Sequence, residues 1–376
     1  MLADDKPPRR RSLRLGEAGA DMPLAKLADL AALRLTLSGE STVDWPRLWF
    51  PDREAVDGFL RLCAFDTDNP VDLGRIRELH RDAVDYLRDV HHIRLLPALE
   101  EPSGVHEVFL ASSLAQGRTR RQACILLKVM HILHHLAGRE LLFNTPISEA
   151  QLLDRLSARV FQVIDRMRAS GVGVVEFAAG QKTRTSLVNK LLAKRSTLAS
   201  QIFDRLRFRI VVQKREDIVL ALLYLSRHLF PFNYVIPEQS QNGIVDAPLV
   251  ARLLELPEGL VTRFWDAQRS GAGANEFSGA SYRSINFVVD IPLRIDDVAP
   301  EHAPAIAFAQ TEIQVVDQET ARANSRGENS HTLYKKRQRE RVRERLEGPE
   351  LALLDRAWLD SLDDDDDDDD DTPRGA

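Results

Sequence analysis

The hydrophobic pattern of this chain changes its period near residue 171, and this change constrains the fold more than any other feature. Between residues 23 and 170, apolar side chains recur at every third or fourth position, which is the period of an amphipathic helix. After residue 171, short runs of β-branched and alternating apolar residues appear instead, as in strands. We therefore expect a mainly α-helical first half and a sheet in the second half.

Length and composition place the chain among folded globular proteins. A chain of 376 residues predicts two domains, and 44% hydrophobic with 29% charged residues is an ordinary balance. No apolar run reaches the roughly 18 residues of a membrane span, and the first residues lack the apolar core of a secretion signal. A cytoplasmic protein without a membrane partner is expected. Cys63 and Cys124 lie in helical patterns and predict neither a disulfide nor a zinc site.

The pattern divides the chain into five expected segments. They are a disordered basic arm at 1–22, a helical domain of unknown role at 23–170, a sheet domain at 171–340 with an insertion at about 231–276, a C-terminal helix at 341–362 and a disordered poly-Asp tail at 363–376. Gly138 and Gly171 stand where helix C-caps are expected. The formal charge of −6 becomes +3 without the nine consecutive aspartates of the tail, which permits a phosphate-bearing ligand without identifying one.

Strands and helices alternate in the second half. Strands are expected at 172–178, 208–212, 284–295 and 307–317, and helices at 184–203 and 217–230. This succession predicts an α+β fold.

A group of cations and a hydroxyl opens the second half. A spacing of four residues separates Lys182, Ser186 and Lys190, so these three share one face if a helix extends back to residue 182. Arg184 lies close by in the sequence. Such a face can hold a polyphosphate. Taken alone, the pattern is more often a solvated basic surface.

Two carboxylates lie next to predicted strands. Asp204 precedes the strand at 208–212, and Mg²⁺ takes one or two carboxylates together with phosphate oxygens. A single Asp at a strand entrance is usually a cap. Glu312 and Gln314 alternate with apolar residues, and they are expected to face a cleft if the apolar residues face the core. Asp204 and Glu312 would then share a metal.

The order of these elements resembles the alarmone synthetase domain of the RelA/SpoT superfamily, over about residues 180–336. The elements are Lys182-x3-Ser186-x3-Lys190, Asp204-x4-Arg209-Ile210, Ser281-Tyr282-Arg283-Ser284, Glu312-Ile313-Gln314 and His331-Thr332-Leu333-Tyr334-Lys335. Five elements in the right order are more specific than any one of them. The resemblance implies an α+β fold in which a mixed β-sheet, nucleotidyltransferase-like synthetase domain is flanked by helices and preceded by an all-α domain.

The resemblance also implies a reaction. Pyrophosphate would pass from ATP to the 3′-hydroxyl of GDP, GTP or another nucleotide or RNA acceptor, with Mg²⁺ as cofactor. The residues implied to bind ATP are Arg209, against the adenine, and the phosphate ligands Lys182, Arg184, Ser186 and Lys190.

Further roles are implied for the metal and the acceptor. Asp204 and Glu312 would bind Mg²⁺, and Glu312 would also activate the attacking hydroxyl. Tyr282 would stack on the acceptor base. The other residues implied to bind the acceptor are Gln314, His331 and Lys335.

Three positions depart from the family pattern. Gly180 stands where an arginine is expected, so half of an adenine clamp is missing unless Arg184 or Arg207 substitutes for it. Arg207 replaces a glycine, and Asn286 replaces a histidine. These changes leave open an ordinary synthetase, a synthetase with another acceptor, or a nucleotide-sensing module without turnover, whose helical half engages an unknown protein partner. RNA binding through Arg9–Arg11 and the helix near residues 335–345 is a weaker alternative.

The histidines of the first half invite a metal interpretation. His131, His134 and His135 have no acidic partner at a usual ligand spacing, so core or helix-surface positions are expected. The chain also lacks the His-Asp pair of the hydrolase domains that often accompany alarmone synthetases. No hydrolase activity is expected.

Overall fold

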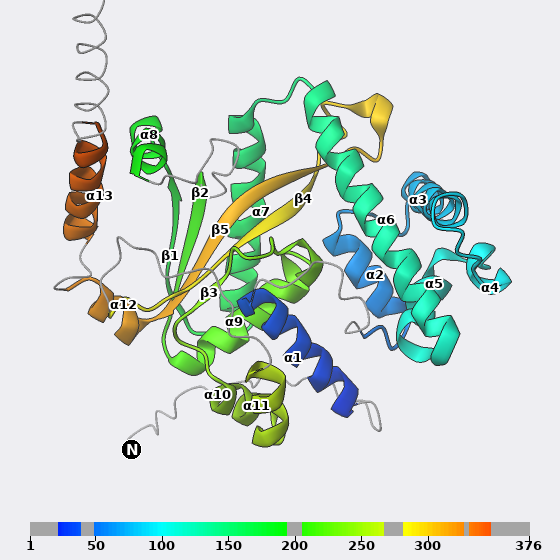
Figure 1. The fold of residues 1–376 in the computed structure, drawn as a ribbon, viewed down its shortest axis with the longest axis horizontal. Coiled ribbons are helices and arrows are strands. Elements are labelled where there is room, and N and C mark those ends of the chain that lie inside the picture. Colours follow the sequence, from blue (N-terminus) through cyan, green and yellow to red (C-terminus); the bar gives the residue numbers. More distant parts are fainter. Residues whose placement is uncertain (1–21, 39–48, 194–204, 267–280, 327–330, 347–376) are drawn as a thin grey trace, which may run out of the picture. The chain divides into compact units, whose positions relative to one another are not determined.

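The structure is a computed structural model that describes residues 22–38, 49–193, 205–266, 281–326 and 331–346 (Figure 1). Contacts divide the chain into two compact units. The first unit comprises Met1–Gln181, Phe203–Ala274 and Arg283–Ala323, and the second comprises Lys182–Ile202, Asn275–Tyr282 and Asn324–Ala376. Within the described ranges, every helix is too short or too polar to span a bilayer.

Helices dominate the first part of the first unit, as predicted. They are α1 (Met22–Ser38), α2 (Arg53–Leu62), α3 (Pro70–Asp89), α4 (Pro97–Glu100), α5 (Val105–Leu114), α6 (Gly117–Asn144) and α7 (Glu149–Ala169). Several of these helices begin at a capping residue, whose side chain accepts a hydrogen bond from a backbone amide in the first turn of the helix. Ser148, for example, forms a capping box with Gln151 at the start of α7.

One of the two predicted helix ends is wrong. α6 continues through Gly138 to Asn144. The glycine is needed there because the helix approaches the sheet closely. A Cβ atom at this position would lie 2.4 Å from the ring of Phe308 and 2.7 Å from the carbonyl oxygen of Ile306. Gly171 follows the last turn of α7 with a φ of 93°, so the second predicted helix end is confirmed.

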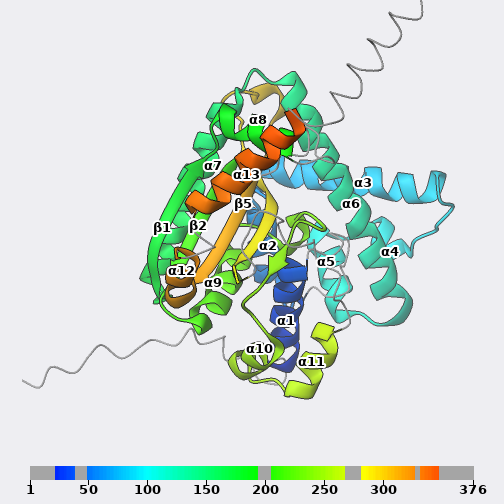
Figure 2. The same ribbon diagram turned by 60° about the vertical axis from the view of Figure 1, so that its left-hand side comes forward.

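The second half forms a five-stranded sheet in the order β1-β2-β5-β4-β3 (Figure 1 and Figure 2). β2 and β5 are parallel and all other neighbours are antiparallel, so the sheet is mixed and the predicted α+β fold is confirmed. The strands are β1 (Val174–Gln181), β2 (Leu206–Val212), β3 (Gln241–Asn242), β4 (Ile285–Arg294) and β5 (Ile306–Asp317). The four predicted strands correspond to β1, β2, β4 and β5.

The segment predicted as an insertion is part of the sheet. It contributes β3, whose Gln241 pairs with Asn286 of β4, and it also forms α10 (Ala247–Leu254) and α11 (Glu258–Asp266). A strand of two residues carries no alternating pattern, and for that reason the sequence did not reveal it.

One face of the sheet forms the core. α7 and α9 (Arg215–His228) cover this face (Figure 1). On β2, Phe208 and Ile210 point into it and are buried, and they pair with the buried Ile313 and Val315 of β5. We call this the packed face.

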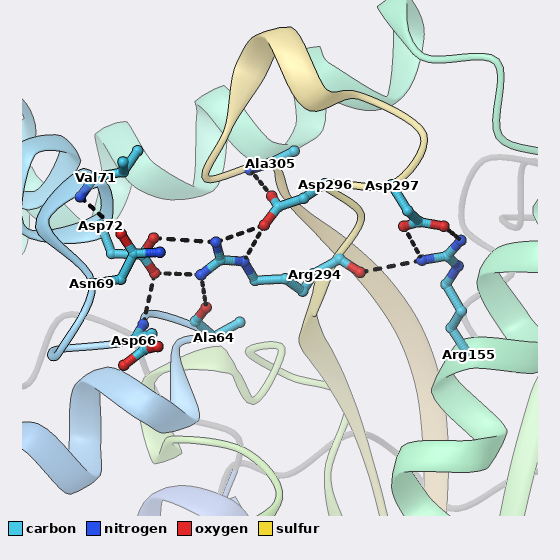
Figure 3. A network of polar contacts seen from close by, with 10 residues as sticks. All are labelled: Ala64, Asp66, Asn69, Val71, Asp72, Arg155, Arg294, Asp296, Asp297 and Ala305. Carbon is cyan, nitrogen blue, oxygen red and sulfur yellow. Dashed lines mark hydrogen bonds and ion pairs between the residues drawn. The ribbon is translucent and has the colours of Figure 1, made fainter.

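A polar network connects the helical segment to the sheet (Figure 3). Arg294, the last residue of β4, forms an ion pair with Asp72 of α3 and a second one with Asp296, at 2.6 Å from Nη2 to Oδ2. Asp72 is fully buried and also accepts a hydrogen bond of 2.7 Å from the backbone amide of Asp66. The helices and the sheet thus share one compact unit, whereas the predicted boundary lay at residue 171.

The second unit contains two helices in contact with each other, α8 (Arg184–Ala193) and α13 (His331–Leu346). The predicted C-terminal helix therefore begins ten residues earlier than expected, at His331. Gln338 and Val342, one turn apart on α13, are both buried, so the polar sequence around them still forms a packed helix.

Candidate functional site

The face of the sheet opposite the packed face carries polar side chains, and we call it the polar face. Two rows of residues cross it from β1 to β4. The first row is Gly180, Arg207, Glu312 and Val288, and the second row is Ala178, Arg209, Gln314 and Asn286. The parallel pairing of β2 with β5 therefore brings together predicted site residues that lie about a hundred positions apart in the chain.

The centre of the first row is an ion pair. Nη2 of Arg207 lies 2.8 Å from Oε2 of Glu312, which is a short, charge-assisted hydrogen bond. The Glu312 side chain is only 10% exposed, and that of Arg207 is 40% exposed. Glu312 therefore points away from the packed face as predicted, but its carboxylate is engaged by a guanidinium.

The second row contains two amide side chains that are joined by hydrogen bonds. Nε2 of Gln314 donates to Oδ1 of Asn286 at 2.9 Å, and Nδ2 of Asn286 donates to Oγ of Ser284 at 2.9 Å. Gln314 is buried, so this chain holds its amide in one orientation. Beside it, the buried Nε of Arg209 finds no hydrogen-bond acceptor among the described residues.

Small residues of β1 flank both arginines. Ala178 pairs with Arg209 and Gly180 pairs with Arg207, and both small residues are exposed. Among the described residues, no atom lies within 4 Å of a Cβ atom built on Gly180. The β1 residues that pair with the two arginines therefore have small side chains and are exposed.

The predicted basic face on α8 needs a correction, because the helix does not extend back to Lys182. Thr183 ends it: its Oγ1 accepts the backbone amide of Ser186 at 3.3 Å, and its carbonyl oxygen accepts the amide of Leu187 at 3.1 Å. α8 therefore begins at the exposed Arg184. Only Ser186 and Lys190, four residues apart, share the helical face.

Three further predicted site residues belong to the second unit. Tyr282 precedes β4 and is half-buried, His331 is the first residue of α13, and Lys335 is half-buried on the same helix. These residues belong to the second unit, as do the basic residues of α8. Asp204 lies outside the described residues.

A magnesium site on the polar face would have to be formed by the side chains of the two rows. Mg²⁺ takes one or two carboxylates, and the described member of the predicted pair is Glu312. A guanidinium already neutralises this carboxylate, and it would repel a divalent cation placed beside it. Across the described ranges, no group of three or more His, Cys, Asp or Glu side chains is arranged to hold a metal. While Arg207 holds Glu312, the described residues do not fit Mg²⁺.

The histidines of α6 form a separate cluster. Burial lowers the pKa of His131 and of His134 to about 3, so both are neutral core residues, as predicted. His135 lies 2.8 Å from the buried carboxylate of Asp290 on β4, and its ring contacts Phe308 at 4.6 Å between centroids. α6 thereby occupies the end of the sheet where β5 begins.

Arg207 and Asn286 are two of the positions that depart from the family pattern. In the sheet, Arg207 lies next to Glu312 and Asn286 lies next to Gln314. The available signal was alternation: Arg207 and Arg209 are two residues apart on a strand, so their side chains share a face.

Neither protein families nor curated proteins match the chain by sequence. Solved structures do match. Small alarmone synthetase 2 from Bacillus subtilis is 19% identical, with a TM-score of 0.30 over 60% of this chain and 97% of that one. Small alarmone synthetase 1 from the same organism, bound to its product pppGpp, is 15% identical, with a TM-score of 0.32 over 57% and 93%. A GTP pyrophosphokinase family protein from Streptococcus pneumoniae is 14% identical, with a TM-score of 0.28 over 58% and 95%.

Two of these similar structures are small alarmone synthetases and the third is a GTP pyrophosphokinase family protein. The five sequence elements resemble the same kind of enzyme. With TM-scores near 0.3, what this chain does has to be inferred from its own residues.

Proposed function

We propose that this protein is a nucleotide pyrophosphokinase. It would transfer pyrophosphate from ATP to the 3′-hydroxyl of GDP, GTP or another nucleotide or RNA acceptor. The observation that carries the proposal is the polar face, where Arg207 and Glu312 lie side by side and Arg209 and Gln314 form the next row.

The chemistry of these groups suits a nucleotide. Guanidinium groups stack on bases and bind phosphates in a bidentate manner. The buried Nε of Arg209 finds no hydrogen-bond acceptor among the described residues, and we assign this arginine to the adenine. The residues proposed to hold the phosphates are Lys182, Arg184, Ser186 and Lys190. Those proposed to bind the acceptor are Tyr282, Gln314, His331 and Lys335.

In the proposed reaction, the acceptor oxygen attacks the β-phosphorus of ATP. The new bond joins that oxygen to the β-phosphorus, the bond from the β-phosphorus to the bridging α–β oxygen breaks, and AMP leaves. Glu312 takes the proton of the attacking hydroxyl. Such transfers depend mainly on positioning and on neutralising charge, which is what an array of fixed cations supplies.

The test is incubation with γ-³²P-ATP, Mg²⁺ and each of GDP, GTP, ADP and bulk tRNA. A labelled product, with AMP formed in equal amount, is expected for at least one acceptor in the wild type. Glu312→Gln should form none while it keeps its unfolding temperature. A product of equal amount in this variant would refute the assigned role.

A second function is favoured by the same ion pair. A carboxylate engaged by Arg207 fits a nucleotide-sensing module that binds ATP without turnover. ATP binding without AMP formation, for every acceptor, would support this alternative over the enzyme.

A further inference from the structure

Helix α13 carries a dense positive charge. Residues 335–343 contain six lysines and arginines and one glutamate, which gives a net charge of +5 over nine residues. Arg339 and Arg343 are four residues apart, so their like charges repel each other along the helix. Oε1 of Glu340 lies 3.9 Å from Nζ of Lys336, and this one carboxylate can offset only one of the six cations. A further anion beside the helix would reduce the repulsion.

Part of this charge lies on one exposed side of α13. Gln338 and Val342 are buried and mark the side of the helix that packs. Lys336, Arg339 and Arg343 are spaced three and four apart, so they share a side of the helix other than the buried one. The Lys336 side chain is 70% exposed, and Arg339 and Arg343 are exposed as well. We call these three residues the basic stripe.

An anion of matching size is present in the same chain. Residues 363–371 are nine consecutive aspartates, and they belong to the second unit together with α13. Residues 347–362 separate them from the end of α13 at Leu346. Extended, this linker spans up to about 55 Å, whereas α13 is about 24 Å long. Gly348 and Pro349 follow the helix and favour a change of chain direction. The aspartates can therefore reach the whole basic stripe.

We propose that the aspartate run at residues 363–371 binds the basic stripe of α13 in the same molecule and shields it from other polyanions. Charge complementarity selects this partner, because nine carboxylates that are ionised at neutral pH meet a stretch with a net charge of +5. Tethering adds to the attraction, since a segment linked to its own binding site acts at an effective concentration on the order of millimolar. A separate polyanion would have to displace it.

The proposal concerns the charges of the second unit and does not depend on pyrophosphate transfer. Removing the charges of the aspartate run should make the basic stripe accessible to the phosphates of an RNA strand. Reversing the charges of the stripe should abolish that gain. Salt should weaken the contact between the aspartates and the stripe, because both partners are charged and the stripe is exposed.

The first test is cross-linking of the full chain with a carbodiimide, which joins a carboxylate to an amine only where the two are in contact. Mass spectrometry of the monomeric product should find residues 363–371 joined to Lys336 at low salt, and less of this product at about 0.5 M NaCl. Lys214 is the internal control, because it is exposed and belongs to the first unit. Cross-links no more abundant at Lys336 than at Lys214 would overturn the proposal. Cross-links found only in dimers would overturn it too, since the aspartates would then bind another molecule.

The second test measures the binding of labelled polyuridine RNA to the full chain at low salt. Replacing all nine aspartates of residues 363–371 by asparagine keeps the length and removes the charge, and it should lower the dissociation constant on the order of tenfold. Lys336→Glu with Arg339→Glu, added to this neutral variant, should remove the gain. Arg252→Glu with Arg263→Glu is the matched control, because it reverses two exposed charges on α10 and α11, and it should keep the gain.

Two results of the RNA experiment would contradict the proposal. Equal affinity of the wild type and the neutral variant would show that the aspartates shield nothing. A gain that persists with Lys336→Glu and Arg339→Glu would place the shielded surface outside α13.

Discussion

Arginine–carboxylate pairs in two regions of this molecule differ in how deeply the carboxylate is buried. In the junction, which we define as the contact of α3 and α6 with β4 and β5, Asp72 is fully buried and is held by both Arg294 and the amide of Asp66. On the polar face, the side chains of Arg207 and Glu312 are 40% and 10% exposed, against 31% and 0% for Arg294 and Asp72.

This difference in burial indicates which charges maintain the fold and which are available to a ligand. A fully buried carboxylate held by several donors is costly to disturb, and a pair that keeps more contact with solvent contributes less to stability. Changes in the junction should therefore alter the free energy of unfolding, and changes on the polar face should alter ligand binding.

The largest effect is expected from Asp72→Ala. It leaves the guanidinium of Arg294 without its buried partner and should lower the free energy of unfolding by about 3–5 kcal/mol in urea denaturation. Glu78→Ala removes an exposed ion pair from the same helix and should cost less than about 1 kcal/mol. Equal losses in the two variants would remove the distinction between buried and exposed pairs.

The next effect concerns pH. His131 and His134 are neutral in the folded protein because burial lowers their pKa to about 3, whereas histidine in the unfolded chain has a pKa near 6.5. Their neutral state is fully compatible with folding above pH 6.5, and stability is lost as pH falls from 6.5 towards 3. The upper limit is about 1.4 kcal/mol per pH unit for each histidine.

Urea denaturation between pH 7.5 and pH 5 measures this slope. His134→Leu should make it shallower, because one of the two titrating groups is gone. A slope that is unchanged in this variant would show that His134 does not titrate with folding.

A smaller effect is expected from Gly138→Ala. The new methyl group would clash with Phe308 and with a backbone oxygen, so the free energy of unfolding should fall by about 1–3 kcal/mol. Gly74→Ala places the same methyl group in α3, where it would meet no atom of the described residues within 4 Å, and it should raise stability by roughly 0.5–1 kcal/mol. Calorimetry of both variants should therefore give shifts of opposite sign.

The smallest loss of stability is expected from Arg207→Gln, at about 1 kcal/mol, because the new amide can still donate a hydrogen bond to Glu312, whose side chain is only 10% exposed. The same substitution at Arg294 should cost several times more, since Arg294 serves two carboxylates. If Arg207→Gln destabilises the protein as much as Arg294→Gln, the ion pair on the polar face maintains the fold as the junction does.

The sequence predicted most of the fold because the main elements carry their own periodicity. In β2, β4 and β5, apolar residues alternate with polar ones or form continuous runs, over strands of seven residues or more. In the long helices, apolar residues recur at every third or fourth position. Gly138 was mistaken for a helix end because a local rule detects glycine, but the close approach of Phe308 requires it. The start of α8 was also misplaced, since the capping bonds of Thr183 depend on backbone geometry.

The candidate site was only partly predictable. Alternation placed Glu312 and Gln314 on one face, and the structure adds their neighbours on β2 and β4. The pairing of Glu312 with Arg207 joins residues 105 positions apart, and strand register cannot be read from local sequence. Asp204, the basic arm and the poly-Asp tail lie outside the described residues, so their roles stay predictions.

The central claim is that the polar face binds the nucleotide, and equilibrium binding of radiolabelled ATP tests it most directly. Arg209→Gln should raise the dissociation constant on the order of tenfold, because it removes a guanidinium from the proposed adenine site. Arg252→Gln, which removes an exposed arginine from α10, should leave the constant unchanged. Equally tight ATP binding by the wild type and by Arg209→Gln would contradict the account.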